Sequence, residues 1–161
     1  MNEQDKRLAE AVLERLCKGA QIGGIRFGPV LQILIGDGNY EGEPLKGQVH
    51  LYLGSSWRVF ENRPTSFPNG EDELPEAPED EQIQTIVSIR ERVINKVELG
   101  ETEPHLILTL EDDRVLFVNG KHDQYECWQI GVAFSGAEES WLVVACPGGG
   151  IAVWTPKTFV F

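Results

Sequence analysis

Residues 3–18 carry apolar side chains at the spacing of an α-helix, in a stripe formed by Leu8, Val12 and Leu16. Residues three or four positions apart lie on one side of a helix. Asn2 or Asp5 can cap the start of this helix, and Gly19 can end it. A stripe this narrow predicts a helix that packs on a sheet. A helix that docks on a partner is the alternative.

The remainder of the chain alternates short apolar runs with turn-forming residues, a pattern typical of antiparallel β structure. The strands expected from this pattern are residues 29–35, 49–53, 57–60, 93–99, 105–110, 114–118, 124–130, 141–146 and 151–154. β-Branched residues also favour a strand within 82–92, and the tail 157–161 is a candidate edge strand. The expected fold class is α+β, with an N-terminal helix packed on an antiparallel β-sheet.

Three short stretches have the composition of tight turns, namely residues 36–38, 111–113 and 147–150. The last of them is a Pro-Gly-Gly-Gly sequence. It lacks the lysine and the Ser/Thr of a phosphate-binding loop. It therefore predicts a turn that needs positive φ, rather than a ligand cradle.

Two parts of the chain, residues 20–60 and 93–155, share an order of features: strand, turn, strand, tryptophan-bearing strand. Trp57 aligns with Trp128 at an offset of 71 residues, and residues 33–35 align with 107–109 at an offset of 74. A duplicated β-meander would produce this order. Any two β-meanders also share such a rhythm, so both interpretations stay open. We expect one domain over residues 1–161, a usual length for a single domain.

Negative charge is concentrated in one part of the chain. The net charge is −12, and residues 71–81 supply −7 of it, which leaves −5 for the rest. Residues 61–81 also hold four prolines, so we expect an exposed, mobile loop that links the two halves. The acidic residues of this run are the expected partner-binding residues: Glu71, Asp72, Glu73, Glu76, Glu79, Asp80 and Glu81.

The composition excludes several classes of function. A field of this sign repels nucleic acid and anionic lipid and attracts a basic protein. No apolar run approaches the roughly 20 residues that span a bilayer, and the charged N-terminal stretch does not have the pattern of a secretory signal. Three cysteines without a Cys-x-x-Cys pair predict reduced, buried thiols; a Cys127–Cys146 bridge is the alternative. We therefore expect a cytoplasmic protein.

No arrangement of residues predicts catalysis, a metal site or a cofactor. The densest set of metal-ligand types, residues 122–127, would place Glu126 and Cys127 on opposite faces of a strand. Ser135 and Ser140 do not lie in a Gly-x-Ser-x-Gly elbow. The remaining candidates for an enzyme are three histidines that lack an obvious partner in sequence: His50, His105 and His122. The four tryptophans are expected in the core, with a ligand groove as the alternative.

Residues 106–118, the tryptophan strand at 125–128 and the Pro-Gly-Gly-Gly-x-Ala-Val-Trp motif at 147–154 resemble a family of small bacterial proteins of unknown function. Small acidic α+β proteins of this type are often immunity proteins, so the resemblance implies neutralisation of a toxin. The expected function is a non-catalytic binding protein that inhibits a basic toxin. The alternative is a structural protein that self-associates, as a homodimer, through its tryptophan-rich sheet.

Overall fold

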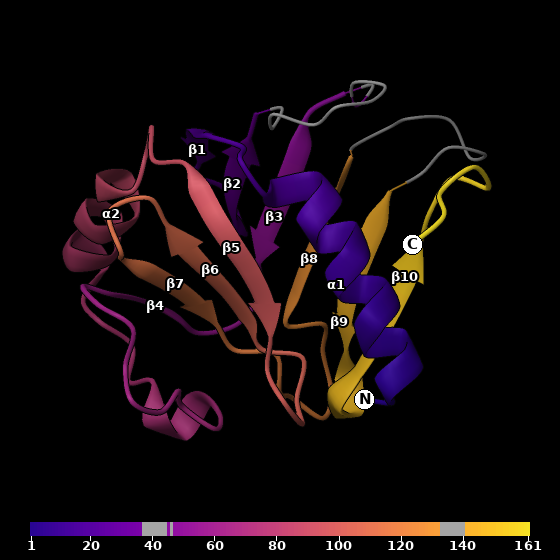
Figure 1. The fold of residues 1–161 in the computed structure, drawn as a ribbon. Helices are drawn as coiled ribbons and strands as arrows, with labels where there is room; N and C mark the ends of the chain where they lie inside the picture. Colours follow the sequence, from indigo (N-terminus) through magenta and orange to yellow (C-terminus); the bar gives the residue numbers. More distant parts are fainter. Residues whose placement is uncertain (37–44, 46, 133–140) are drawn as a thin grey trace.

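The computed structural model describes residues 1–36, 45, 47–132 and 141–161. Within them the chain forms α1 (Glu3–Cys17), β1 (Ile22–Arg26), β2 (Leu31–Ile35), β3 (Val49–Leu53), β4 (Trp57–Phe60), η1 (Glu71–Glu73), α2 (Glu79–Ser88), β5 (Ile94–Leu99), β6 (Leu106–Leu110), β7 (Val115–Val118), β8 (Trp128–Val132), β9 (Leu142–Cys146), η2 (Pro147–Gly149) and β10 (Gly150–Trp154). The strands make two antiparallel sheets, in the orders β1-β2-β3-β8-β9-β10 and β4-β7-β6-β5 (Figure 1). The predicted α+β class is confirmed.

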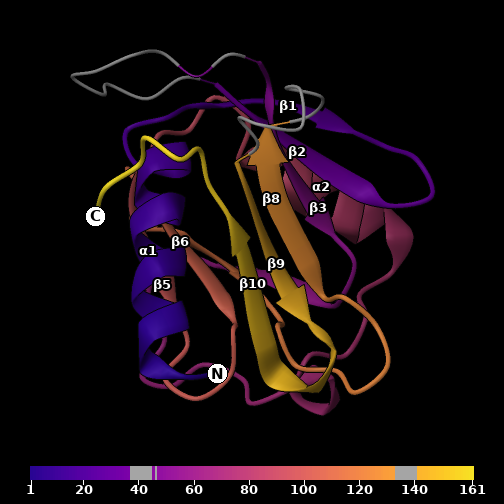
Figure 2. The same cartoon turned by 90° about the vertical axis from the view of Figure 1, so that its right-hand side faces the viewer.

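The N-terminal helix closes one open side of the two sheets. Asn2 caps α1 by accepting a hydrogen bond from the Asp5 amide at 2.8 Å, and Gly19 follows the helix at φ 76°. The face that holds Val12 and Leu16 is fully buried against β5, β9 and β10. Because β5 and β10 are edge strands of different sheets, α1 bridges the two sheets (Figures 1 and 2). The predicted helix and its packing role are confirmed.

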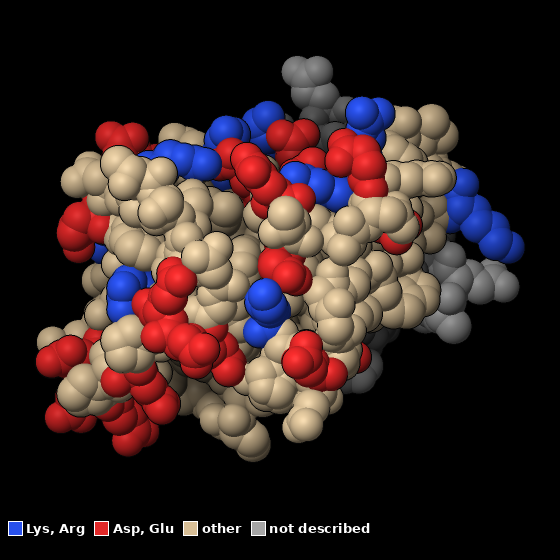
Figure 3. Space-filling view, turned by 90° about the horizontal axis from the view of Figure 1, so that it is seen from below, with Lys and Arg blue, Asp and Glu red and all other residues tan. Residues whose placement is uncertain are grey.

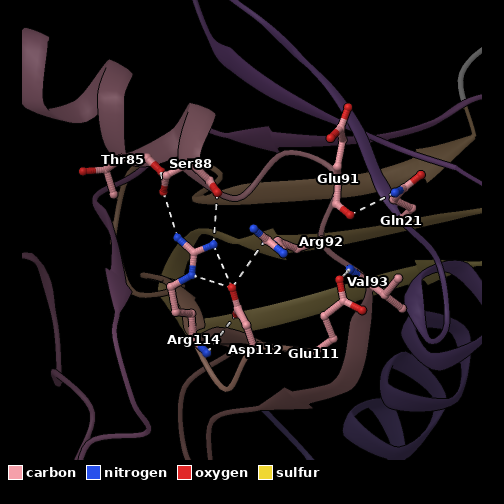
Figure 4. A network of polar contacts seen from close by, with 9 residues as sticks. All are labelled: Gln21, Thr85, Ser88, Glu91, Arg92, Val93, Glu111, Asp112 and Arg114. Atoms are coloured by element: carbon pink, nitrogen blue, oxygen red, sulfur yellow. Dashed lines mark hydrogen bonds and ion pairs between the residues drawn. The ribbon is translucent and has the colours of Figure 1, made fainter.

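The prediction of a strand within residues 82–92 is wrong, because most of this segment belongs to α2. Its first turn is Glu79, Asp80 and Glu81, whose negative charges are favourable at a helix N-terminus. Ile86 and Ile89, three residues apart, are completely buried. At the other end, Arg114 donates to the Ser88 carbonyl oxygen at 3.0 Å and to the Ser88 hydroxyl at 2.9 Å (Figure 4). Burial and end charges thus outweigh β-branched propensity.

The segment 61–81 holds more regular secondary structure than predicted. It contains η1 and the first turn of α2, so the expectation of a loop is wrong over these residues. Leu74, 3% exposed, anchors the segment in a small apolar cluster with Phe117 and Val115. Phe67 stacks on Phe117 with ring centroids 5.5 Å apart. Leu74, within the acidic run, and Phe67, before it, therefore hold this segment against the sheet.

Most predicted strands are confirmed, with shorter ends. The strand expected at 124–130 starts only at Trp128, and the described tail 157–161 holds no strand. Instead Phe159 packs edge-on against Trp141, with ring centroids 4.9 Å apart. The turns at 111–113 and 147–150 are confirmed, and Gly148 and Gly149 have positive φ as expected. The turn expected at 36–38 lies largely outside the described residues.

The two halves of the chain have the same topology. Each half supplies a helix, a three-stranded meander and a fourth strand that joins the sheet of the other half. The meander β1-β2-β3 is completed by β8, and the meander β5-β6-β7 is completed by β4. Trp57 pairs with Val118 and Trp128 pairs with Leu53, the last residue of each meander. These pairings make Trp57 and Trp128 structurally equivalent, as their sequence alignment predicts.

The halves meet through reciprocal backbone hydrogen bonds. The Gly19 amide donates to Ile94 O and the Glu91 amide donates to Ile22 O, both at 2.7 Å. Ile22 N likewise donates to Arg92 O, as Ile94 N does to Ala20 O, both at 2.9 Å. A 72-residue offset relates every member of these pairs. In the second strands the offset is 75, since Leu31 and Leu106 occupy the same register position. The predicted offset of 74 there is wrong by one residue.

One position of this junction tests the equivalence. Gly19 and Glu91 both have positive φ, 76° and 69°, but only glycine adopts it without steric cost. We expect Gly19→Ala to lower the free energy of unfolding by about 1 kcal/mol, and Glu91→Gly to leave it unchanged or raise it by up to about 1 kcal/mol. Urea denaturation measures both. Glu91→Ala, which keeps the strain, is the control. A destabilising Glu91→Gly would contradict the equivalence.

Candidate functional site

A cleft of about 750 Å³ lies between the turn that joins β1 to β2, the start of β4, and the segment from η1 to α2. Its lining residues include Phe27, Val30, Trp57, Val59, Glu71 and Ile83. Strands β1 and β4 are the two sheet edges at this side of the molecule. The molecule thus has two open sides, each between an edge strand of one sheet and an edge strand of the other. Helix α1 closes the side between β5 and β10, and the cleft lies at the side between β1 and β4.

The cleft is open because the halves are not the same length. In the six-stranded sheet β9 and β10 extend the sheet beyond β8, and α1 packs against both (Figure 2). The equivalent strand β4 has no such neighbour within the described part of the chain and forms the edge of its sheet. Helix α2 has 10 residues and α1 has 15. A shorter helix and two fewer strands leave the space unfilled.

The walls of the cleft expose large apolar side chains. Phe27 is 55% exposed, Ile83 39% and Val30 38%, and all three line the cleft. Only a few other large apolar residues of the described chain are as exposed. Apolar side chains gathered at a concave surface are typical of binding sites.

A network of polar side chains closes one end of the cleft. Glu71 Oε1 accepts a hydrogen bond from Ser55 Oγ at 2.7 Å and another from the Tyr125 hydroxyl. Ser55 Oγ in turn accepts from Nδ2 of the buried Asn119 at 2.8 Å. His122 stacks on Tyr125 with ring centroids 3.5 Å apart. The network draws residues from η1, the β3–β4 turn and the β7–β8 connection, so it fixes the carboxylate in place.

The hydrogen bonds set the charge of this network. Those from Tyr125 and Ser55 lower the pKa of Glu71, because they stabilise its carboxylate. Burial, and then the neighbouring carboxylate, raise the pKa of Tyr125 to about 12. At neutral pH the cleft therefore presents a fixed negative charge with a protonated phenol beside it.

The predicted partner-binding residues divide into two groups. Glu71 is partly buried in the network, whereas the other six are exposed. Glu71, Glu76 and Glu79 line the cleft, while Asp72 and Glu73 line a neighbouring hollow with Lys121. Viewed from below, acidic side chains gather at the left, the end at which Figure 1 places α2 (Figure 3). Sequence reasoning missed the apolar part of the site, since Phe27 and Ile83 meet only in the fold.

The histidines are used in separate places. His105 is buried, and its Nδ1 accepts from the Gly120 amide at 2.9 Å. Burial lowers its pKa, as it does for His50, whose Nδ1 lies 3.3 Å from Gln32 Oε1. His122 Nδ1 accepts from the Gln124 amide at 3.1 Å. Only His122 contacts a residue of the cleft, so the structure does not gather the three candidates.

The remaining candidate groups have structural roles or lie elsewhere. The three cysteines are free, and burial raises the pKa of Cys127 to about 11. Trp128 is buried and donates to the Pro104 carbonyl oxygen at 2.8 Å. Ser135 and Ser140 are outside the described residues. Across the part of the chain that is described, no group of three metal-ligating side chains is placed to hold an ion, and no helix is long and apolar enough to cross a membrane.

Comparison of the chain with protein-family models, with curated proteins and with solved structures gives no match.

The Glu71 network predicts a pH dependence of stability. The pKa of the Glu71 carboxyl is lower in the folded protein than its ordinary value near 4.5. The carboxylate therefore stabilises the fold above pH 4.5, and this stabilisation is lost as pH falls through the folded pKa. We expect Glu71→Gln to cost about 1 kcal/mol at pH 7, and less as pH falls below 4.5. Denaturation at several pH values measures this. The exposed Glu76→Gln is the control, and a pH-independent difference for Glu71→Gln would contradict the network.

Proposed function

We propose that this protein is a non-catalytic binding protein that takes a basic protein partner at the cleft, as an immunity-type inhibitor takes a basic toxin. The observation that carries the proposal is the cleft itself, an apolar surface with carboxylates on its rim. Exposed Phe27 and Ile83 provide the apolar contact. Glu76 and Glu79 provide exposed negative charge at the same opening.

The mechanism consists of steering followed by occlusion. Clustered negative charge raises the rate at which a basic surface approaches, and salt screens this effect. Once the partner docks, burial of apolar side chains supplies most of the affinity. A cleft that covers the lysine- and arginine-rich active site of a toxin would block its substrate without any chemistry. The acidic residues thus act on association rate and choice of partner.

A different surface supports the alternative, self-association. Trp154 lies at the end of the edge strand β10 and is 51% exposed. Val160 and Phe161, in the tail that follows it, are 89% and 66% exposed. The other tryptophans are at least partly buried. A homodimer would therefore form through β10 and the tail, not through the tryptophan-rich sheet face.

Affinity capture from the native host tests the proposal. The tagged chain should retain a basic protein in stoichiometric amount at low salt and release it at high salt. The triple variant Asp72→Asn, Glu76→Gln, Glu79→Gln, which removes both exposed carboxylates of the cleft, should bind that protein about tenfold more weakly at low salt, mainly through slower association. Mass spectrometry identifies the partner, and surface plasmon resonance measures the rates.

A matched variant provides the control. Glu61→Gln, Glu101→Gln, Glu126→Gln removes three exposed carboxylates outside the acidic run and should bind like the unmodified chain. If both triple variants bind the partner with equal affinity, the acidic residues at the cleft do not contribute to binding, and that part of the proposal is wrong. Capture of a neutral or acidic protein that salt does not release would overturn it.

The alternative has its own test. If the chain self-associates through β10, Trp154→Glu places a charge in the contact and should convert the dimer to monomer, as measured by sedimentation. The cleft variant Ile83→Glu should leave the dimer intact. A chain that is monomeric at high concentration without either change contradicts the alternative.

A further inference from the structure

We infer that the open edge of β4 binds an extended, basic segment of the partner as an added antiparallel strand, in the position that β9 occupies on β8. The inference deepens the proposed function and rests on it for the charge of the partner. It begins from the direction in which the backbone groups of β4 point.

The hydrogen-bond pattern of β4 leaves two residues with unpaired backbone groups. The Asn119 amide donates to Ser56 O at 2.9 Å, which fixes the phase of the antiparallel ladder between β4 and β7. Bonded and non-bonded pairs alternate along such a ladder. Arg58 and Phe60 therefore face β7, whereas the amides and carbonyls of Trp57 and Val59 face the open edge. Within the described residues no other backbone group bonds to them.

The equivalent residues of the other half are paired. Trp128 corresponds to Trp57, so Ile130 corresponds to Val59. The Val132 amide donates to Trp141 O at 3.0 Å, which sets the phase between β8 and β9. By the same alternation, the backbone groups of Trp128 and Ile130 face β9. One half of the molecule thus contains the strand that the other half lacks.

The cleft provides room for that strand. Trp57, Arg58 and Val59 all line it, so the open edge of β4 lies within its wall. The four residues of β4 are all half-buried, as in an edge strand beside an open space. Exposed Phe27 and Ile83 lie on the same cleft and would contact the side chains of an added strand. Strand addition supplies affinity through the main chain and specificity through such contacts.

The pairing of β9 indicates which side chains fit. Ala145 lies opposite Trp128, and Val143 lies opposite Ile130. By equivalence, a small residue should lie opposite Trp57 and a β-branched residue opposite Val59. Of the charged residues that line the cleft, three are acidic and Arg58 is the basic one. This balance favours a segment with basic residues flanking a short apolar core.

A synthetic peptide tests the inference. Its sequence, Lys-Lys-Leu-Val-Val-Ala-Ser-Lys-Lys, copies residues 142–145 of β9 between basic ends. Added to the full ¹⁵N-labelled chain, it should shift the amide signals of Trp57 and Val59 and slow their hydrogen exchange. N-methylation of the first valine and the alanine removes the donors that face β4 and should weaken binding about tenfold.

The control peptide is N-methylated at the leucine and the second valine, whose amides face away from β4. It should bind as the unmodified peptide does, and the protein is unaltered throughout. Equal weakening by both methylation patterns, binding that leaves Trp57 and Val59 unperturbed, or no binding overturns the inference. The inference is also overturned if β4 already pairs with the β4 strand of a second copy of the chain. In that case dilution would speed up the hydrogen exchange of the Trp57 and Val59 amides.

Two further outcomes separate this inference from the proposed function. If a basic partner captured from the host binds without perturbing the Trp57 and Val59 amides, the proposed function stands and the strand site is wrong. If a peptide with serine in place of lysine binds β4 equally well, the strand site stands and the charge preference is wrong.

Discussion

The architecture depends on the backbone hydrogen bonds that join the two halves. The amide of Gly19 reaches Ile94 and that of Glu91 reaches Ile22, so each helix end is tied to the first strand of the other half. These hydrogen bonds lie at the first residue of each meander, since Ile22 begins β1 and Ile94 begins β5. Strands β4 and β8 are exchanged between the two sheets, since β4 pairs with β7 and β8 pairs with β3. Burial of apolar side chains stabilises this arrangement, but the backbone pairing sets its register.

The same junction explains a residue that sequence alone would not single out. Glu91 has a left-handed backbone, which costs a non-glycine residue roughly 1 kcal/mol. Its equivalent is Gly19, which we identified only as a helix stop. Both positions follow a helix and both supply an amide to the junction. The strain at Glu91 persists because the surrounding hydrogen bonds over-determine its conformation. At the opposite end of this region, the contacts of Arg114 with Ser88 and Asp112 hold α2 against the β6–β7 turn (Figure 4).

Local patterns were sufficient for α1 and for most strands, because a single apolar stripe or strict alternation identifies those elements without knowledge of their neighbours. They failed at α2, where β-branched residues suggest a strand. Its helical state depends on the charges of its first turn and on Ile86 and Ile89 reaching the core. The acidic residues of the cleft could be identified from the sequence, because they belong to one run of charged residues. The apolar residues could not, since Phe27, Val59 and Ile83 come from three elements that only the folded chain brings together.

The likeness between the halves gives a reason for the cleft that its residues alone do not provide. A fold with two equivalent sheets and equivalent helices would close both open sides in the same way. Here one side has β9, β10 and a 15-residue helix, and the other has a 10-residue helix and a bare edge. An open edge is a hazard for a folded protein, because it can pair with any extended chain. The surroundings of β4 limit this hazard. Half-burial restricts access, and the exposed carboxylates of Glu76 and Glu79 place negative charge at the same cleft. An edge with these surroundings fits the binding function that we propose, because charge beside an open strand edge favours some partners over others.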